Sequence, residues 1–290
     1  MNRLWLHVLH RFGKLDQIIQ YRRSHSSLPN IIRPKNFNEK IIWRMFFDRR
    51  MLLATTCDKL LTKELALERC PNLLAAETLW VGDNLRESLN SDVSGDWVLK
   101  EISGSGRIYF GSGIIDSATL LKMEHETAHW EKDNKHSKKR SWALSMAREG
   151  FFIERRISVD IPQDFKFHVF SGQVAFCGVD YSRFEDHRRA CFNRDGDLIP
   201  VSYGFEVPDQ VDPLPENYRE MVSIAERLTA EFDYMRIDLY SIEDKVYFGE
   251  FTPYPARGRD KVNPAIYEKL WGDLWNLPKW RHRRSSNVPN

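Results

Sequence analysis

The sequence lacks the features that mark secreted, disulfide-bonded and membrane-spanning proteins. No apolar stretch approaches the about 20 residues of a membrane span, and the N-terminus has neither the continuous apolar core nor the small-residue cleavage site of a signal peptide. The few cysteines form no CxxC pair and no zinc-ribbon spacing. They are Cys57, Cys70, Cys177 and Cys191. We therefore expect a soluble cytoplasmic protein with free thiols.

A strong charge of one sign is also missing. Lysine and arginine number 43 against 41 acidic residues, so the net charge is +2 and gives no bulk attraction to nucleic acid. Nucleic acid is not an expected partner. No internal repeat, Walker A loop or convincing Ser/His/Asp or Cys/His set is present. The 290 residues, 42% of them hydrophobic, suffice for one large domain or two modest ones.

The N-terminal segment, residues 1–23, has a helical period of apolar side chains with basic residues between them. Two interpretations stay open. The segment is the first helix of the fold, or it is a peripheral contact that lies on the inner face of an anionic membrane. The apolar positions are Leu4, Trp5, Val8, Leu9, Phe12, Leu15, Ile18 and Ile19.

Helical and strand patterns alternate along the rest of the chain. Helices are predicted at Asn36–Arg50, opening at an Asn38 cap signal, and at Cys57–Arg69, Ser117–Asn134 and Glu216–Phe232. Strands are predicted at Thr78–Val81, Asp96–Glu101, Arg107–Phe110, Phe151–Val159, Phe165–Phe170, Val174–Val179 and Arg189–Phe192.

Two further strand patterns, Met235–Tyr240 and Val246–Phe251, predict a hairpin that turns at residues 243–245. If Ile242 pairs with Val246, Asp238 lies opposite Glu250. Adjacent carboxylates repel, and Mg²⁺ held by one or two carboxylates together with substrate phosphates offsets that repulsion. A surface hairpin with solvated acids is the alternative.

The segment VLKEISGSGRIYF places Lys100 at the end of an apolar strand, before the loop Gly104–Gly106. Glycines let backbone amides approach an anion closely, and a lysine at the edge adds positive charge. The segment predicts a phosphate-binding loop or a simple turn between strands.

The segment DFKFHVF alternates strictly, so Asp164, Lys166 and His168 share one face of a strand. This face presents both an acid and a base. The alternative is an exposed strand with a surface ion pair.

A competing motif reads HExxH, with His125, Glu126 and His129 on a predicted helix, the pattern of zinc metallopeptidases. Two histidines at i and i+4 can bind zinc, but a third ligand must come from Glu149 or Glu154. The metzincin continuation is absent.

Seven segments carry a common resemblance when they are taken in chain order. They are FNEKIIW at Phe37–Trp43, DK at Asp58–Lys59, VLK with GSG at Val98–Gly106, IER at Ile153–Arg155, DFKF at Asp164–Phe167, MRIDLY at Met235–Tyr240 and FGEFTPYPARG at Phe248–Gly258. Together they resemble the TupA-like ATP-grasp family, which is linked to teichuronopeptide and other surface-polysaccharide biosynthesis. The resemblance runs from about residue 34 to residue 277.

The resemblance implies an α+β fold in which two lobes clasp ATP. With the two lobes so implied, the small lobe with its Gly-rich flap is expected at 76–156 and the large lobe with the metal hairpin at 157–278. The local pattern predicts a helical N-terminal region at 1–75, and the basic, polar composition of 279–290 predicts a disordered tail.

Individual roles follow from the same resemblance. The implied nucleotide ligands are Lys59, Lys100, the flap residues Ser103, Gly104, Ser105 and Gly106, the hinge residue Glu154, the ribose ligand Asp164 and the phosphate ligand Lys166. Asp238 and Glu250 resemble the Mg²⁺ ligands. Many ATP-grasp enzymes have asparagine where this chain has Thr252, which puts a second Mg²⁺ in doubt.

The implied reaction is that of a carboxylate–amine ligase that uses ATP and Mg²⁺ and forms an acyl phosphate. Lys100 and Lys166 would hold the nucleotide in line, and Arg236 or Arg257 would stabilise charge on the transferred phosphoryl group. The expected partner is a saccharide or amino-acid acceptor. An ATP-dependent kinase of a saccharide hydroxyl on the same fold and a nucleotide-binding module without turnover are the alternatives.

Overall fold

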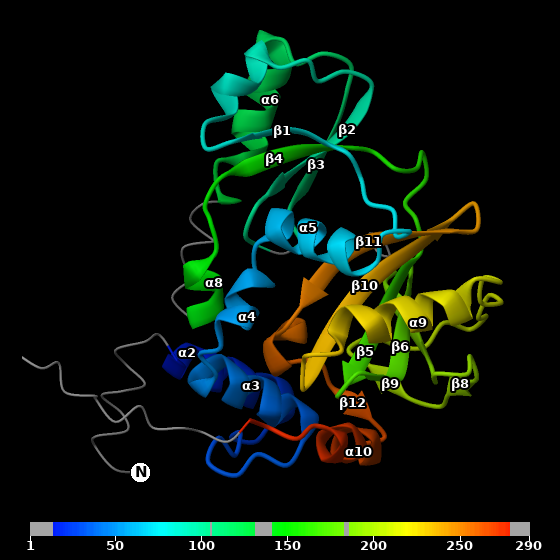
Figure 1. The fold of residues 1–290 in the computed structure, drawn as a ribbon. Coiled ribbons are helices and arrows are strands. Elements are labelled where there is room, and N and C mark those ends of the chain that lie inside the picture. The colour runs from blue at the N-terminus through cyan, green and yellow to red at the C-terminus, as the bar shows by residue number, and fades with distance from the viewer. Residues whose placement is uncertain (1–13, 105, 131–140, 183–185, 279–290) are drawn as a thin grey trace, which may run out of the picture.

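The computed structural model describes residues 14–104, 106–130, 141–182 and 186–278 (Figure 1). Ser105, residues 1–13 of the predicted N-terminal helix and the predicted tail 279–290 lie outside the described residues. The chain forms two antiparallel sheets with helices around them, which is the predicted α+β class. The boundaries proposed between 1–75, 76–156 and 157–278 stay predictions.

The smaller sheet lies at the top of Figure 1, beneath α6. Its strands are rich in aromatic and β-branched residues, and Trp97, Leu99 and Ile153 are fully buried on the face that packs under the helix. The spatial order is β1-β4-β2-β3. The strands are β1 (Thr78–Gly82), β2 (Asp96–Glu101), β3 (Ile108–Ser112) and β4 (Phe151–Arg155).

The larger sheet has six strands in the order β11-β10-β5-β6-β7-β8. Every residue of β5 is buried, and Phe165, Phe167 and Val169 join the main core, where α9 (Tyr218–Thr229) packs. The strands are β5 (Asp164–Phe170), β6 (Gln173–Tyr181), β7 (Arg188–Phe192), β8 (Leu198–Ile199), β10 (Tyr234–Ile242) and β11 (Lys245–Thr252). A separate pair joins β9 (Ser202–Tyr203) to β12 (Val262–Asn263).

The N-terminal helices pack below and between the two sheets (Figure 1). They are α2 (Lys14–His25), α3 (Phe37–Phe47), α4 (Met51–Thr55) and α5 (Lys59–Arg69). α5 connects the sheets, because the Lys59 amide donates to the carbonyl of Ile102, 3.0 Å away, and the chain after the helix pairs with β11 at Leu74. The remaining elements are η1 (Leu85–Asn90), α6 (Ser117–Thr127), α8 (Trp142–Met146), η2 (Pro255–Gly258) and α10 (Ile266–Leu274).

The start of α3 differs from the prediction. Asn36, not Asn38, is the N-cap, and its amide donates to Glu39 Oε2 at 3.2 Å. Asn38 is instead buried in the first turn, where its side-chain amide donates to the carbonyl of Asp260 at 2.8 Å. A buried asparagine with a partner distant in the sequence resembles a cap in sequence, which explains the error.

Two elements are shorter than predicted. β4 ends at Arg155 and not at Val159, because the chain leaves the sheet there and residues 156–158 and 160–162 line a cavity. α6 ends at Thr127, so His125 is in its last turn while His129 follows the helix end. Among the described residues, no helix is long and apolar enough to cross a bilayer. All four cysteines are free and buried, as predicted.

Candidate nucleotide site between the two sheets

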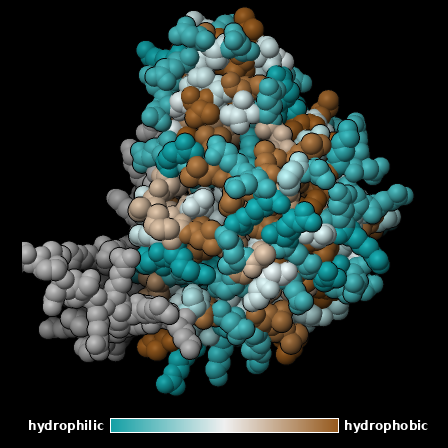
Figure 2. Space-filling view, in the orientation of Figure 1, coloured by the Kyte–Doolittle hydropathy of each residue, from teal (hydrophilic) through white to brown (hydrophobic). Residues whose placement is uncertain are grey.

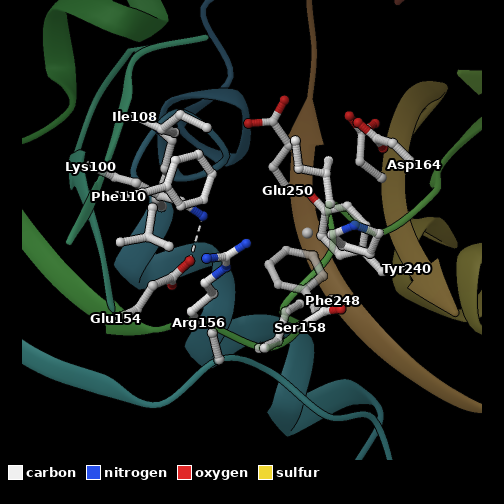
Figure 3. A pocket seen from close by; sticks show the side chains of 18 of the residues that line it. Lys100, Ile108, Phe110, Glu154, Arg156, Ser158, Asp164, Tyr240, Phe248 and Glu250 are labelled. Carbon is white, nitrogen blue, oxygen red and sulfur yellow. Dashed lines mark hydrogen bonds and ion pairs between the residues drawn. The ribbon is translucent and has the colours of Figure 1, made fainter. Parts of the chain in front are cut away.

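A cavity of about 340 Å³ lies between the smaller sheet and the β10–β11 hairpin. Figure 3 shows Lys100, Phe110 and Glu154 on one side of it and Tyr240, Phe248, Glu250 and Asp164 on the other. Its volume is within the range of small-molecule sites. The wall combines charged groups with apolar side chains, which are Ala76, Val98, Ile108, Phe110, Ile157, Ile161, Pro162, Tyr240 and Phe248.

The hairpin places Asp238 opposite Glu250, as predicted, but the residues near the turn pair in a different register. The turn contains only Glu243 and Asp244, whose φ angles are 49° and 57°, so Ile242 pairs with Lys245 instead of the predicted Val246. That shifts the register by one residue. A bulge at Gly249 then shifts it back, so that the two carboxylates face each other.

Gly249 is needed at the bulge because the strands are very close there. A Cβ on this residue would lie 2.7 Å from the carbonyl oxygen of Asp238 and 3.1 Å from the ring of Tyr240. Any larger residue would push the two strands apart. The alignment of Asp238 with Glu250 therefore depends on having glycine at position 249.

The Asp238 carboxylate is surrounded by cations. Arg236 donates two hydrogen bonds of 2.7 Å, from Nε to Oδ1 and from Nη2 to Oδ2, and Lys166 Nζ is 3.1 Å from Oδ2. Burial opposes ionisation of Asp238, but the charges of Arg236 and Lys166 outweigh it and lower its pKa. Asp238 is therefore a carboxylate at neutral pH.

Glu250 and Thr252 complete this group. Arg236 Nη2 is 3.4 Å from Glu250 Oε1 and 3.0 Å from Thr252 Oγ1, and the threonine hydroxyl is 3.1 Å from the same glutamate oxygen. Glu250 lines the cavity and is more exposed than Asp238. Thr252 thus contacts both Arg236 and Glu250.

The strand β5 carries the acid Asp164 and the base Lys166 on one face, as predicted, but this face is buried. Lys166 is paired with Asp238, contacts Asp164 and is 3.5 Å from Asp180 Oδ2. Burial lowers the pKa of Lys166, but the three aspartates outweigh it and raise the pKa above its usual value. The exposed-strand alternative is therefore wrong.

His168, on the same strand, belongs to the core. Its ring stacks on Phe176 with centroids 4.0 Å apart, and Nδ1 is 2.9 Å from the Tyr234 hydroxyl. Burial, together with nearby cations, lowers its pKa far below 6.5, so the ring is neutral. It does not reach the cavity.

On the opposite wall, lysines gather around Glu154. Lys100 forms an ion pair with Glu154, and Lys63 Nζ is 2.8 Å from its other oxygen. Burial raises the pKa of Glu154, but the two lysines outweigh it and lower the pKa overall. Lys63 was not predicted as a site residue. Its position one turn after Lys59 on the same helix face is the signal that could have identified it.

Lys59 supports the glycine-rich loop. Its ammonium donates to the carbonyls of Glu101 at 2.9 Å and Gly104 at 2.6 Å. Burial lowers the pKa of Lys59. Gly104 has φ +139°, and a Cβ on it would lie 2.8 Å from Glu101 Oε2, so glycine is required there.

Some of the predicted site residues line the cavity and others do not. Lys59, Lys100, Gly106, Glu154, Asp164, Asp238 and Glu250 line the cavity. Lys166 and Arg236 lie behind the lining carboxylates, Ser103 is buried, and the Gly104 carbonyl accepts a hydrogen bond from Lys59. Arg257 does not line the cavity; it is in η2, where its carbonyl accepts a hydrogen bond of 2.8 Å from Gln17.

Local sequence patterns did not identify most of the apolar wall, or the polar lining residues Arg107, Arg155, Arg156, Ser158 and Asp160. The missed residues are on strands of both sheets and on the linkers, where no local pattern distinguishes a cavity wall from ordinary core. Asp180, which contacts Lys166 and Arg189, was missed for the same reason.

The zinc interpretation is not supported. His125 and His129 are exposed, and the helix ends between them at Thr127. No group of three or more His, Cys, Asp or Glu side chains positioned to hold a metal occurs in the described part of the chain.

Residues 39–276 match the model of a family described as TupA-like ATPgrasp. A search of the curated proteins finds no significant match. Solved structures with a similar fold include ligases with low sequence identity. The D-alanine–D-alanine ligase of Bacillus anthracis complexed with ATP is 14% identical, with a TM-score of 0.40, over 70% of this chain and 57% of the ligase.

The D-alanine–D-alanine ligase of Helicobacter pylori is 14% identical, with a TM-score of 0.46, over 78% of this chain and 59% of that one. The L-amino acid ligase of Bacillus licheniformis is 12% identical, with a TM-score of 0.40, over 74% and 42%. The chain thus spans about half the length of these structures. Such distant likeness indicates no substrate or partner. On the family match, which covers most of the sequence, the chain belongs to the TupA-like ATP-grasp family and has the ATP-grasp fold.

Proposed function

We propose that the protein is an ATP- and Mg²⁺-dependent carboxylate–amine ligase that proceeds through an acyl phosphate. The observation that carries the proposal is the cavity itself, with lysines on the wall formed by β2 and α5 and a carboxylate pair on the hairpin opposite. Cations on one side suit phosphates, and carboxylates on the other suit the divalent ion that accompanies them.

The nucleotide would occupy this cavity with its base among the apolar side chains. Phe110 and Phe248 supply flat apolar surface for a heteroaromatic ring. Lys100 and Lys63 would reach the phosphates by exchanging their partner Glu154, while Asp164 would accept from the ribose hydroxyls. Gly106 places the flap at the edge of the same cavity.

Asp238 and Glu250 fit a Mg²⁺ ion by their chemistry. Both offer carboxylate oxygens, the donors that Mg²⁺ prefers, and both line the cavity. Bound there, the ion would neutralise the β- and γ-phosphates. The Thr252 hydroxyl contacts Arg236, so this threonine positions the arginine, and we propose one fully coordinated ion rather than two.

The remaining chemistry needs no protein nucleophile. A carboxylate oxygen of the donor forms a bond to the γ-phosphorus of ATP as the bond to ADP breaks, which gives an acyl phosphate. An amine then attacks the acyl carbon, inorganic phosphate leaves with the bonding electrons, and the amine loses a proton. Arg236 and Lys166, held by buried aspartates, supply fixed positive charge beside the reacting groups.

We propose further that the product belongs to cell-surface polysaccharide synthesis, with an amino acid or peptide-like unit joined to a saccharide. Membership of the TupA-like family supports this assignment. His187, stacked on Phe205 with ring centroids 3.6 Å apart, lies at the cavity wall and could form part of an acceptor site.

The test is ATP consumption with a panel of amino acids and uronic-acid saccharides, followed by mass spectrometry of the products. The proposal expects ADP, phosphate and a new amide. ADP with a phosphorylated saccharide would identify a kinase instead. If ATP neither binds with Mg²⁺ nor is consumed with any acceptor, the proposal fails.

A further inference from the structure

The helix α10 has an apolar stripe on its outer side. Ile266, Leu270 and Leu274 recur every four residues, so they lie in one row along the helix. Each is between 48% and 56% exposed. The opposite side of the helix packs on the protein, because Trp271 and Gly272 are buried against α3 and the segment before it. The stripe is therefore not needed to hold the helix in place.

A second exposed apolar group lies on the loop between α2 and α3, at the same end of the molecule (Figure 1). Leu28 is 60% exposed and Ile32 is 74% exposed. The end of this loop packs directly on α10, since a Cβ on Gly272 would lie 2.1 Å from the carbonyl oxygen of Lys35. We call the five residues Leu28, Ile32, Ile266, Leu270 and Leu274 the lower face. Hydrophobic residues are visible among hydrophilic ones at this edge in Figure 2.

The charge around the lower face is positive. Residues 22–35 include no acidic residue, and their basic side chains Arg22, Arg23, Arg33 and Lys35 are all exposed.

The acidic residues near this face are already engaged within the fold. Glu39 accepts hydrogen bonds from the amides of Asn30, at 2.9 Å, and Lys35, at 3.0 Å. Glu268 accepts from Asn38 at 3.1 Å, and Asp273 is paired with Lys269. Three acids near this face thus already have partners within the fold, whereas Arg22, Arg23 and Arg33 are exposed to solvent.

We propose that the lower face docks onto an anionic membrane surface, with the five apolar side chains in the interface and the surrounding arginines and lysines at the lipid headgroups. Exposed apolar side chains ringed by basic residues are the combination that peripheral membrane proteins use. This extends the expected N-terminal contact to a surface formed by elements at both ends of the described chain. α10 lies at the opposite end of the molecule from α6 and the smaller sheet (Figure 1), so docking would leave that lobe in solution.

The test is co-sedimentation of the full-length chain with vesicles of phosphatidylcholine alone or mixed with phosphatidylglycerol. We expect binding to the mixed vesicles only, weakening as salt rises. Leu270→Glu should reduce binding by at least about tenfold, because it removes an apolar contact and adds repulsion from the lipids. Leu121→Glu is the matched control, since Leu121 is a helical residue that is 66% exposed on α6 in the other lobe.

Three results would overturn the proposal. They are no binding of the wild-type chain to phosphatidylglycerol vesicles, equal losses in the two variants, and a concentration-dependent dimer that Leu270→Glu dissociates, which would make the lower face a contact between copies. Circular dichroism and ATP consumption of Leu270→Glu without vesicles separate a docking defect from a folding or catalytic one. The inference does not depend on the proposed ligase activity.

Discussion

Asp238→Asn is the substitution that best tests the charge arrangement of the site. It keeps the shape of the side chain and removes one buried negative charge. Without that charge, Arg236 keeps Glu250, 3.4 Å away, and the weaker influence of Asp164, while Lys166 keeps Asp164 and Asp180. The buried cations Arg236 and Lys166 would then have one carboxylate fewer to compensate their charges.

The cost to folding can be bounded from these contacts. Removing one partner of a buried ion pair costs about 3–5 kcal/mol, because the other charge is left without compensation. The asparagine oxygen still accepts one hydrogen bond and the remaining acids stay near, so we expect the lower end, about 3 kcal/mol, in the free energy of unfolding.

The cost should depend on pH in a defined direction. Arg236 and Lys166 hold the pKa of Asp238 below its usual value of 3.8. The ionised side chain therefore stabilises the fold above pH 3.8, and this stabilisation is lost as pH falls through the lowered folded-state pKa. The difference between wild type and variant should be constant near neutral pH and shrink in strong acid.

Urea unfolding followed by fluorescence, at pH 7 and at decreasing pH, measures this difference. Asp244→Asn is the matched control, because Asp244 is an exposed residue in the turn of the same hairpin. Calorimetric titration with ATP, with and without Mg²⁺, tests the metal role separately, and we expect the Mg²⁺-dependent part of the affinity to fall by at least about tenfold, or 1.4 kcal/mol. Unchanged stability together with unchanged Mg²⁺ dependence would refute the reasoning.

Three further predictions concern the bulge, the opposite wall and the histidine motif. Gly249→Ala should destabilise the protein by about 1–3 kcal/mol in urea unfolding, because its Cβ would lie 2.7 Å from the Asp238 carbonyl; an unaffected midpoint would contradict the bulge. Lys63→Met should weaken ATP binding, measured by calorimetry, by about tenfold through loss of a charge facing the phosphates, and equal binding would remove Lys63 from the site. His125→Ala should leave ATP consumption unchanged, since this exposed residue does not line the cavity, and a zinc-dependent loss of activity would reopen the peptidase interpretation.

The local patterns predicted most of the strands and helices because alternation and helical periodicity are properties of short segments. The errors occurred where distant partners decide the outcome. Asn38 resembled a cap but donates a hydrogen bond to the carbonyl of Asp260, and residues 156–158 continued a strand pattern but leave the sheet to line the cavity.

The pairing of Asp238 with Glu250 was predicted correctly, although the alternation of side chains alone does not produce it. Asp238 faces Glu250 only because the two-residue turn and the bulge at Gly249 shift the register in opposite directions. Neither shift is visible in the alternation of side chains, because a bulge is defined by how two strands pair.

The sequence by itself determined the family, the order of the acidic and basic motifs and the α+β class, because these depend on residue identity and local periodicity. Only the tertiary structure decided which residues meet. It placed Lys63 beside Lys100 on Glu154, put Asp180 next to Lys166, and left Arg257 away from the cavity. The protonation states also depend on the tertiary structure. The charges of Arg236 and Lys166 lower the pKa of Asp238, and burial together with nearby cations keeps His168 neutral. The spacing of residues along the sequence does not reveal these neighbours.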